Sequence, residues 1–117
     1  MVFTVEFFET VDGKSPVEAF LNELRRTDPA DHAAVLAGLA KLRDRKNHRP
    51  PLSKPLGDGL LELRHVGKLN TRVFWFFVKG RCIVAVHGIR NKGQKIPARD
   101  LRTARARRDD WLKRNLR

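Results

Sequence analysis

The sequence lacks the marks of several large classes of protein. Its 117 residues include a single cysteine, Cys82, so no disulfide can form within the chain, and Cys/His spacing typical of a zinc site is absent. No apolar run is long enough to span a bilayer, and the start MVFTVEFFET has neither the basic segment nor the small-residue cleavage site of a signal peptide. These absences favour a single cytoplasmic domain that occupies residues 1–117.

Carboxylates are scarce in the later part of the chain. Between residues 47 and 117 the acidic side chains are Asp58, Glu62, Asp100, Asp109 and Asp110, and they form no cluster in the sequence. A nuclease that uses Mg²⁺ needs several carboxylates around the ion, so a metal-dependent nuclease is disfavoured. We expect neither a metal nor another cofactor.

Basic residues, by contrast, are abundant and unevenly placed. The net charge is +12, and the pI is about 11.1. Residues 1–46 hold 7 basic and 8 acidic residues, whereas residues 87–117 hold 11 basic and 3 acidic ones. Such a field attracts polyanions, which indicates a nucleic acid, an acidic protein or an anionic membrane surface as partner.

The first third of the chain predicts a strand and two helices. Residues 2–8 alternate apolar and polar side chains, as a half-buried strand does. Two helix starts follow, with Ser15 capping before Pro16 and Asp28 capping before Pro29. The apolar face of the second helix is expected to comprise Val35, Leu36, Leu39 and Leu42. The two helices should form an αα-hairpin.

The remainder predicts three strands and a final helix. The Pro/Gly-rich stretch 46–59 is expected to be a loop. Strands are predicted at 60–66, 71–78 and 81–89, and a basic helix from Pro97 onward. The order β-α-α-β-β-β-α indicates an α+β domain in which helices pack on a largely antiparallel sheet.

Turn lengths predict how the three consecutive strands pair. If the KG dipeptide forms a two-residue turn, Arg72 lies opposite His87, and if GKL forms the preceding turn, Arg64 lies opposite Arg72. The next row on this face is then expected to contain Glu62, Phe74 and Ala85. Arg64, Arg72 and His87 would thus form one row across three strands.

Two arginines on facing strands repel each other, so an anion is expected between them. The anion is either Glu62, in a structural ion-pair network, or a phosphate of a ligand. A helix is expected to cover the apolar rows beside the arginines and to leave their cationic end open. Those rows are predicted to contain Phe74, Phe76, Ile83 and Ala85.

This inventory suits cleavage of RNA by its own 2′-hydroxyl group. Guanidinium groups hold phosphate oxygens and stabilise a pentavalent phosphorane, while an imidazole or a lysine can move the protons. His87 can alternatively be a strand-end residue that bonds to the backbone. The catalytic candidates are Arg64, Arg72, His87, Lys92 and Lys95. The candidates for RNA binding are Arg90, Arg99, Arg102, Arg105 and Arg108.

The segments LLELR, RVFWFFV and HGIRNKGQKIP, followed by an Arg- and Ala-rich helix, resemble the HigB branch of the RelE-like toxins and its phage-derived relatives. The resemblance spans about residues 58–111, and the order of elements before it also agrees. Departures are Ile89 after the His-Gly pair, Asn91 in place of the first lysine of the loop, and Ile96 in place of a threonine. The chain contains no tyrosine, so a tyrosine base of the kind some RelE-like enzymes use is excluded.

The resemblance implies the RelE-like fold and a toxin of a type II toxin–antitoxin system. Such a toxin is an endoribonuclease that cuts mRNA, commonly on the ribosome, and is neutralised by a helix-turn-helix, HigA-like antitoxin. Operator DNA would be bound only through the antitoxin, and no membrane partner is implied. Functional positions would be Arg64, Arg72, Lys92 and Lys95. The alternatives are a non-catalytic module of the same fold that binds RNA or the ribosome, and a basic protein that mainly holds an acidic partner.

Overall fold

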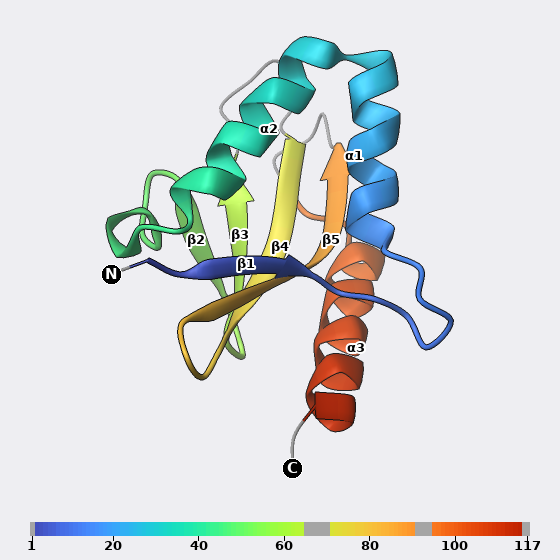
Figure 1. Cartoon of the computed structure of the whole chain (residues 1–117), viewed down its shortest axis with the longest axis vertical. Coiled ribbons are helices and arrows are strands. Elements are labelled where there is room, and N and C mark those ends of the chain that lie inside the picture. Colours follow the sequence, from blue (N-terminus) through green and yellow to red (C-terminus); the bar gives the residue numbers. More distant parts are fainter. Residues whose placement is uncertain (1, 65–70, 91–94, 116–117) are drawn as a thin grey trace.

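The computed structural model describes residues 2–64, 71–90 and 95–115 of the chain, which form five strands packed between three helices (Figure 1). The strands are β1 (Thr4–Phe7), β2 (Ser53–Gly57), β3 (Leu60–Arg64), β4 (Thr71–Val78) and β5 (Cys82–Arg90). The helices are α1 (Pro16–Thr27), α2 (Pro29–Lys41) and α3 (Ala98–Asn115), with a 3₁₀ turn, η1, at Arg45–Asn47. The α+β class predicted from the sequence is confirmed, and the predicted elements occur in the predicted order, with β2 as an additional strand.

Both predicted helix starts are present. The Ser15 hydroxyl accepts a hydrogen bond of 3.2 Å from the Glu18 amide, and Pro16 is the first residue of α1. Asp28 caps α2 in the same way and accepts a bond of 3.1 Å from the Asp31 amide. Because Asp28 also ends α1, the two helices meet at a single residue and turn back on each other.

The strands form one mixed sheet in the order β1-β5-β4-β3-β2. β1 runs parallel to β5, and all other neighbouring strands are antiparallel. β1 and β2 therefore lie at the two edges, while β4 and β5 lie inside the sheet. The inner strands carry the longest apolar runs of the chain, as strands covered on both faces do.

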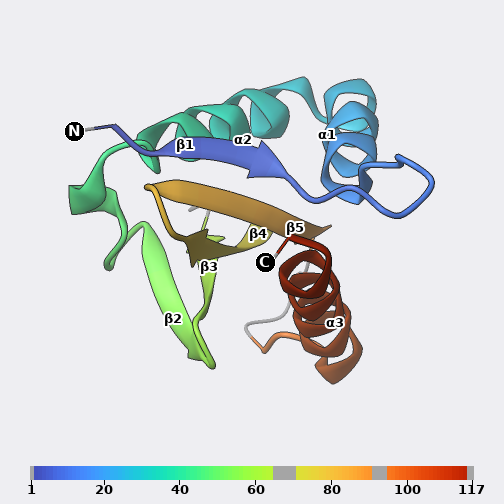
Figure 2. The same ribbon diagram turned by 60° about the horizontal axis from the view of Figure 1, so that its bottom comes forward.

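Each face of the sheet packs against helices (Figure 2). α1 and α2 cover one face, where Trp75, Ile83 and Ala85 belong to the core. α3 covers the other face, where Phe74 and Phe76 pack with Ala104 and Trp111. None of the helices described in the structure is both long and apolar enough to cross a membrane.

The prediction that residues 46–59 form only a loop is wrong, because β2 lies within them. Ser53 to Pro55 pair with Leu63 to Leu61 of β3, and the register shifts before Gly57. Pro55 favoured the loop prediction, because proline is disfavoured in an inner strand. It is tolerated, however, at a sheet edge. The sheet edge is where β2 lies.

The predicted pairing of β3 with β4 is confirmed, whereas that of β4 with β5 is wrong. Arg64 lies opposite Arg72 as expected. Val78, however, pairs with Cys82, because Arg81 takes a left-handed conformation (φ 62°) and lengthens the turn. A bulge then shifts the register again, so that His87 lies opposite Phe74 instead of Arg72.

The slipped register moves side chains to the other face. Ile83 and Ala85, predicted beside the arginine row, pack instead with Trp75 under α1 and α2. A shift of one residue inverts the face on which every side chain lies, which explains the error. Leu36, predicted on the buried face of α2, is also exposed, with a relative exposure of 43%.

Candidate functional site

Three charged side chains of β3 and β4 meet on the α3 face of the sheet. Arg64 Nε lies 3.5 Å from Glu62 Oε1, and Arg72 Nε lies 3.7 Å from Glu62 Oε2. The facing pair of Arg64 and Arg72 brings both guanidinium groups to one carboxylate. Two cations around one anion leave a net positive charge, and we call this group the arginine pair.

The members of the arginine pair differ in how much they are exposed. The Arg64 side chain is 46% exposed, whereas the side chains of Arg72 and Glu62 are 5% and 2% exposed. Glu62 Oε2 makes no hydrogen bond to any part of the chain that the structure describes. A buried carboxylate needs compensating charge, so Arg72 balances Glu62 inside the protein. Arg64 presents its charge to solvent and can receive a ligand.

His87 lies opposite Phe74, which in turn lies opposite Glu62 of the arginine pair. Both of its ring nitrogens contact side chains of α3. Its Nε2 atom lies 2.8 Å from Asp100 Oδ1, and its Nδ1 atom lies 2.9 Å from Arg107 Nη1. The ring stacks on Phe74 at a centroid distance of 5.8 Å and an interplanar angle of 19°. The side chain is 16% exposed.

The two contacts fix the tautomer of His87. A guanidinium group can only donate, so the Nδ1 atom next to Arg107 must accept. Nε2 therefore carries the ring proton and donates a hydrogen bond to the Asp100 carboxylate. In this arrangement His87 has no ring nitrogen free to bind a substrate.

Arg107 ties α3 to the bulge in β5. Val86 has no partner on β4, and its carbonyl oxygen accepts a bond of 3.0 Å from Arg107 Nη1. Burial lowers the pKa of the Arg107 guanidinium, because the charged form loses solvation. Among the residues that the structure describes, no carboxylate forms an ion pair with Arg107.

Asp100 and Arg107 were not among the site residues predicted from the sequence, although both contact His87. They stand seven residues apart in α3, which corresponds to two helical turns and places both on one side of the helix. This spacing was the available signal. The spacing could not be connected with His87 from the sequence, because the bulge that turns His87 toward α3 was not predicted.

Arg90 lies apart from the arginine pair. Its guanidinium group contacts Asp28 Oδ2 at 2.9 Å and Asp31 Oδ2 at 3.8 Å. The hydroxyl of Thr71, opposite Arg90 on β4, donates to the same Asp31 carboxylate. Arg90 thus fastens the end of β5 to the start of α2, on the face of the sheet that α1 and α2 cover.

Four arginines of α3 are spaced by three residues and wind around the helix as one ridge. The ridge contains Arg99, Arg102, Arg105 and Arg108. Arg99 and Arg102 are exposed. Arg105 Nε lies 3.8 Å from Asp58 Oδ2, and Arg108 Nη1 donates a bond of 2.5 Å to the Asp58 carbonyl. The ridge therefore runs from solvent to the β2–β3 turn.

The predicted lysines fall at the edge of what the structure describes. Lys95 is exposed and lies just before α3. Lys92 belongs to residues 91–94, which lie outside the described residues, as does the end, at 65–66, of the strand predicted at 60–66. Within the described part of the chain, no three His, Cys, Asp or Glu side chains are grouped as metal ligands would be.

Comparison with known proteins gives one family match, which covers most of the chain. The model of the family "Phage derived protein Gp49-like (DUF891)" matches residues 22–109, which include α2, the four strands β2 to β5, the second half of α1 and most of α3. No curated protein matches the chain with significance. The match covers the arginine pair, His87 and the arginine ridge. The chain belongs to the phage-derived Gp49-like family, which comprises HigB-like toxins of the RelE superfamily.

Proposed function

We propose that the protein is the toxin of a type II toxin–antitoxin system and an endoribonuclease that cleaves mRNA on the ribosome. The observation that carries the proposal is the arginine pair, in which two facing guanidinium groups share one buried carboxylate and one of them reaches solvent. Membership in a family of HigB-like toxins supports the assignment. Its partners are mRNA, the ribosome and a helix-turn-helix antitoxin.

The arginine pair binds the scissile phosphate and stabilises its negative charge during cleavage. The 2′-oxygen of the RNA attacks the adjacent phosphorus and forms a phosphorane, and the bond from phosphorus to the 5′-oxygen then breaks. Arg64 contacts the phosphate oxygens, while Arg72 holds Glu62 and with it the position of Arg64. The products are a 2′,3′-cyclic phosphate and a free 5′-hydroxyl group.

Two proton transfers complete the reaction. A base takes the proton of the 2′-hydroxyl, and an acid gives a proton to the departing 5′-oxygen. His87, Lys92 and Lys95 are the candidates for these roles. His87 can act only after Nδ1 is released from Arg107 or Nε2 from Asp100, since both nitrogens are engaged in the free protein.

The basic surface around the arginine pair binds the rest of the RNA. Arg99 and Arg102 are exposed on α3, and Lys95 precedes that helix. Arg105 and Arg108 extend the ridge toward the β2–β3 turn, where Asp58 holds them. Arg90 remains a proposed RNA contact only if RNA displaces it from Asp28.

The locked histidine favours a second candidate function. A protein whose Arg72 is ion-paired and whose His87 is engaged on both nitrogens can grip RNA without cutting it. It would then inhibit translation by occupying the ribosome. RNA that is bound but remains intact distinguishes this candidate from the nuclease.

Expression of the wild type and the Arg64→Ala variant in bacteria tests the proposal. The wild type should arrest growth and generate new 5′ ends within mRNA, whereas Arg64→Ala should do neither while remaining folded. Arg26→Ala is the matched control, because Arg26 is exposed on α1 and contacts only Glu23 among the described residues. If the wild type generates no new 5′ ends, the nuclease assignment is wrong, and if Arg64→Ala generates the same new ends as the wild type, the role of Arg64 is wrong.

The role of His87 is tested separately by NMR of the imidazole nitrogens. In the free protein Nε2 should carry the proton and Nδ1 should not, and Arg107→Ala should free Nδ1. If His87→Gln retains cleavage at the wild-type rate, the proton carriers are the lysines. Loss of cleavage with retained RNA binding assigns the role to His87.

A further inference from the structure

The outer edge of β1 pairs with no other strand among the described residues, and only the Phe3 amide, just before β1, is engaged on that side, by the Arg43 carbonyl oxygen at 2.8 Å. β1 ends the sheet, and its inner side bonds to β5 through Thr4 N to Arg81 O at 2.9 Å and Phe8 N to Ala85 O at 2.8 Å. Because the direction of the amides alternates along a strand, the Val5 and Phe7 amides point away from β5. In Figure 1, β1 lies in front of the other strands.

An apolar groove runs along one side of this edge. Val5 and Phe7 of β1 face Leu36 and Leu39 of α2 across a hollow of about 350 Å³. Val5 and Phe7 are only partly buried, and Leu36 is the exposed leucine that the sequence placed in the core. Alternate side chains of an added strand would enter this groove.

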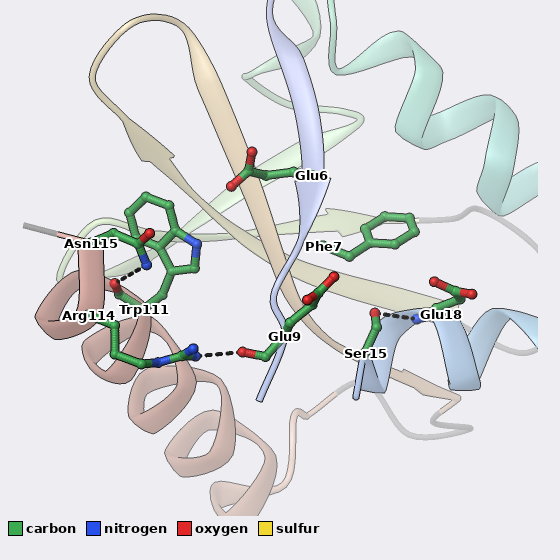
Figure 3. Close-up of a pocket in the computed structure, with 8 residues that line it drawn as sticks. All are labelled: Glu6, Phe7, Glu9, Ser15, Glu18, Trp111, Arg114 and Asn115. Atoms are coloured by element: carbon green, nitrogen blue, oxygen red, sulfur yellow. Dashed lines mark hydrogen bonds between the residues drawn. The ribbon is translucent and has the colours of Figure 1, made fainter. Parts of the chain in front are cut away.

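The opposite side of the edge borders an acidic pocket (Figure 3). The pocket has a volume of about 460 Å³ and lies between β1, the start of α1 and the end of α3. Its carboxylates are Glu6, Glu9 and Glu18. All three residues are exposed. The chain as a whole carries a net charge of +12, so these three carboxylates make the pocket an acidic region on a basic protein.

The Arg114 guanidinium does not cancel this charge. Arg114 pairs with Asp110 at 3.0 Å and donates to the Glu9 carbonyl oxygen at 2.5 Å, so its charge is balanced by Asp110 and not by the Glu9 carboxylate. At physiological ionic strength the Debye length is about 8 Å, so the remote basic residues are screened there. A cationic side chain near β1 therefore responds mainly to the three glutamates.

We propose that β1 receives an added strand from a partner protein, and that this strand alternates apolar and basic side chains. Its backbone would pair with the outward amides and carbonyls of Val5 and Phe7. Its apolar side chains would fill the groove beside Leu36, and its lysines or arginines would meet Glu6 and Glu9. Main-chain bonds supply affinity in this mode of binding, and the alternating side chains supply selectivity.

A second copy of the chain fits this edge poorly. Pairing of β1 with its own copy would bring the segment TVEF to the same groove, and its glutamate would approach Glu6 and Glu9. Like charges on facing strands destabilise the pair. The occupant is therefore a different, basic segment. This inference does not depend on RNA cleavage.

The capped peptide Thr-Val-Lys-Val-Lys-Val-Lys-Thr tests the proposal with the full-length protein. Amide hydrogen exchange measured by NMR should slow at Val5 and Phe7 when the peptide is added. Thr4 and Phe8 provide an internal control, because their amides already bond to β5 and should not change. A peptide with glutamate in place of lysine should bind at least tenfold more weakly.

Two further comparisons separate strand addition from general charge attraction. A peptide of the same composition with its lysines grouped together should lose the protection of Val5 and Phe7. The variant Glu6→Lys, Glu9→Lys should invert the preference and bind the glutamate peptide more tightly, while it remains folded because both side chains are exposed.

Three results would overturn the proposal. One is no protection at Val5 and Phe7 with about 1 mM peptide, the limit of weak specific binding. Another is equal binding of the alternating and grouped peptides. The third is a dimer in light scattering whose Val5 and Phe7 amides are protected without any peptide, which would make a second copy the occupant.

Discussion

At the scale of single residues, one carboxylate organises the proposed site. Glu62 is buried between Arg64 and Arg72, and the two arginines share it unequally, since one is exposed and the other is not. The same residue type therefore serves two purposes within one row. We propose that Arg72 maintains the fold of the site and that Arg64 contacts the ligand.

Removal of each arginine should have a different effect on stability. Arg72→Ala leaves Glu62 buried with only a half-exposed partner, and we expect the free energy of unfolding to fall by about 3 kcal/mol. Arg64→Ala removes an exposed group and should cost less than about 1 kcal/mol. Urea unfolding followed by circular dichroism measures both values. Equal losses would contradict the division of roles, and Glu62→Gln added to Arg72→Ala should recover part of the loss.

The single cysteine should react slowly in the folded protein. Burial raises the pKa of the Cys82 thiol, chiefly because the thiolate loses solvation. Less thiolate is then present near pH 8, so alkylation by iodoacetamide should be slower than in the urea-unfolded chain. Since the folded state holds this proton more tightly, the free energy of unfolding should fall as the pH rises above the ordinary thiol pKa. Mass spectrometry measures the alkylation rate. The variant Cys82→Ala should lose the part of the pH dependence of unfolding that comes from this thiol. Equal alkylation rates in the two states would refute the assignment.

At the scale of elements, the sequence predicted what local chemistry determines. The two helix starts followed from Ser15 with Pro16 and from Asp28 with Pro29, since capping depends on neighbours in the chain. The pairing of Arg64 with Arg72 followed from a turn length and was confirmed. The class and the order of elements were also predictable, because apolar periodicity carries them.

Features that depend on the backbone conformation of one residue were not predictable. The left-handed Arg81 lengthened a turn, and the bulge at Val86 moved His87 by one residue pair. The contacts of Asp100 and Arg107 with the two ring nitrogens of His87 depend on that shift, so they could not be predicted from the sequence. A strand register is the sum of such local events, so one unrecognised turn misplaces every later partner.

The glycine of the His-Gly pair explains a close approach between elements. A Cβ atom at Gly88 would lie 2.5 Å from Cδ2 of Phe20, a rigid ring on α1. We expect Gly88→Ala to lower the free energy of unfolding by about 1–3 kcal/mol through overpacking. Gly38→Ala is the matched control: its nearest neighbour is the flexible Leu63 side chain at 3.2 Å, and a helix gains about 1 kcal/mol from alanine.

The control separates close packing from the general effect of replacing glycine. Gly38→Ala should be close to neutral in thermal unfolding, while Gly88→Ala should lower the midpoint by several degrees. Phe20→Leu combined with Gly88→Ala should recover part of the loss. A neutral Gly88→Ala would show that α1 can move away from β5 at no cost.

At the scale of the whole molecule, charge is distributed by face. The arginine pair and the ridge of Arg99, Arg102, Arg105 and Arg108 lie on the side of the sheet that α3 covers. The carboxylates of Glu6, Glu9 and Glu18 gather at the edge formed by β1. We propose that RNA approaches the first surface and a basic strand of a partner the second.

Salt dependence should report which arginines touch RNA. For single-stranded RNA, each phosphate contact contributes about 0.7 to the slope of log K against log salt concentration. Arg99→Ala with Arg102→Ala should lower the slope by about 1.4, because both side chains are exposed. The control Arg25→Ala with Arg26→Ala, exposed on α1, should leave it unchanged. Fluorescence anisotropy at several salt concentrations gives the slopes, and an equal drop in both pairs would indicate non-specific attraction.

The chemical nature of the cut RNA end tests the central claim most directly. Purified protein, ribosomes and an mRNA of known sequence should yield fragments that end in a 2′,3′-cyclic phosphate, formed by attack of the 2′-oxygen beside Arg64. The Arg64→Ala variant, folded by circular dichroism, should yield none, and Arg26→Ala should match the wild type. Intact mRNA with the wild type, or the same fragments with Arg64→Ala, would contradict the account.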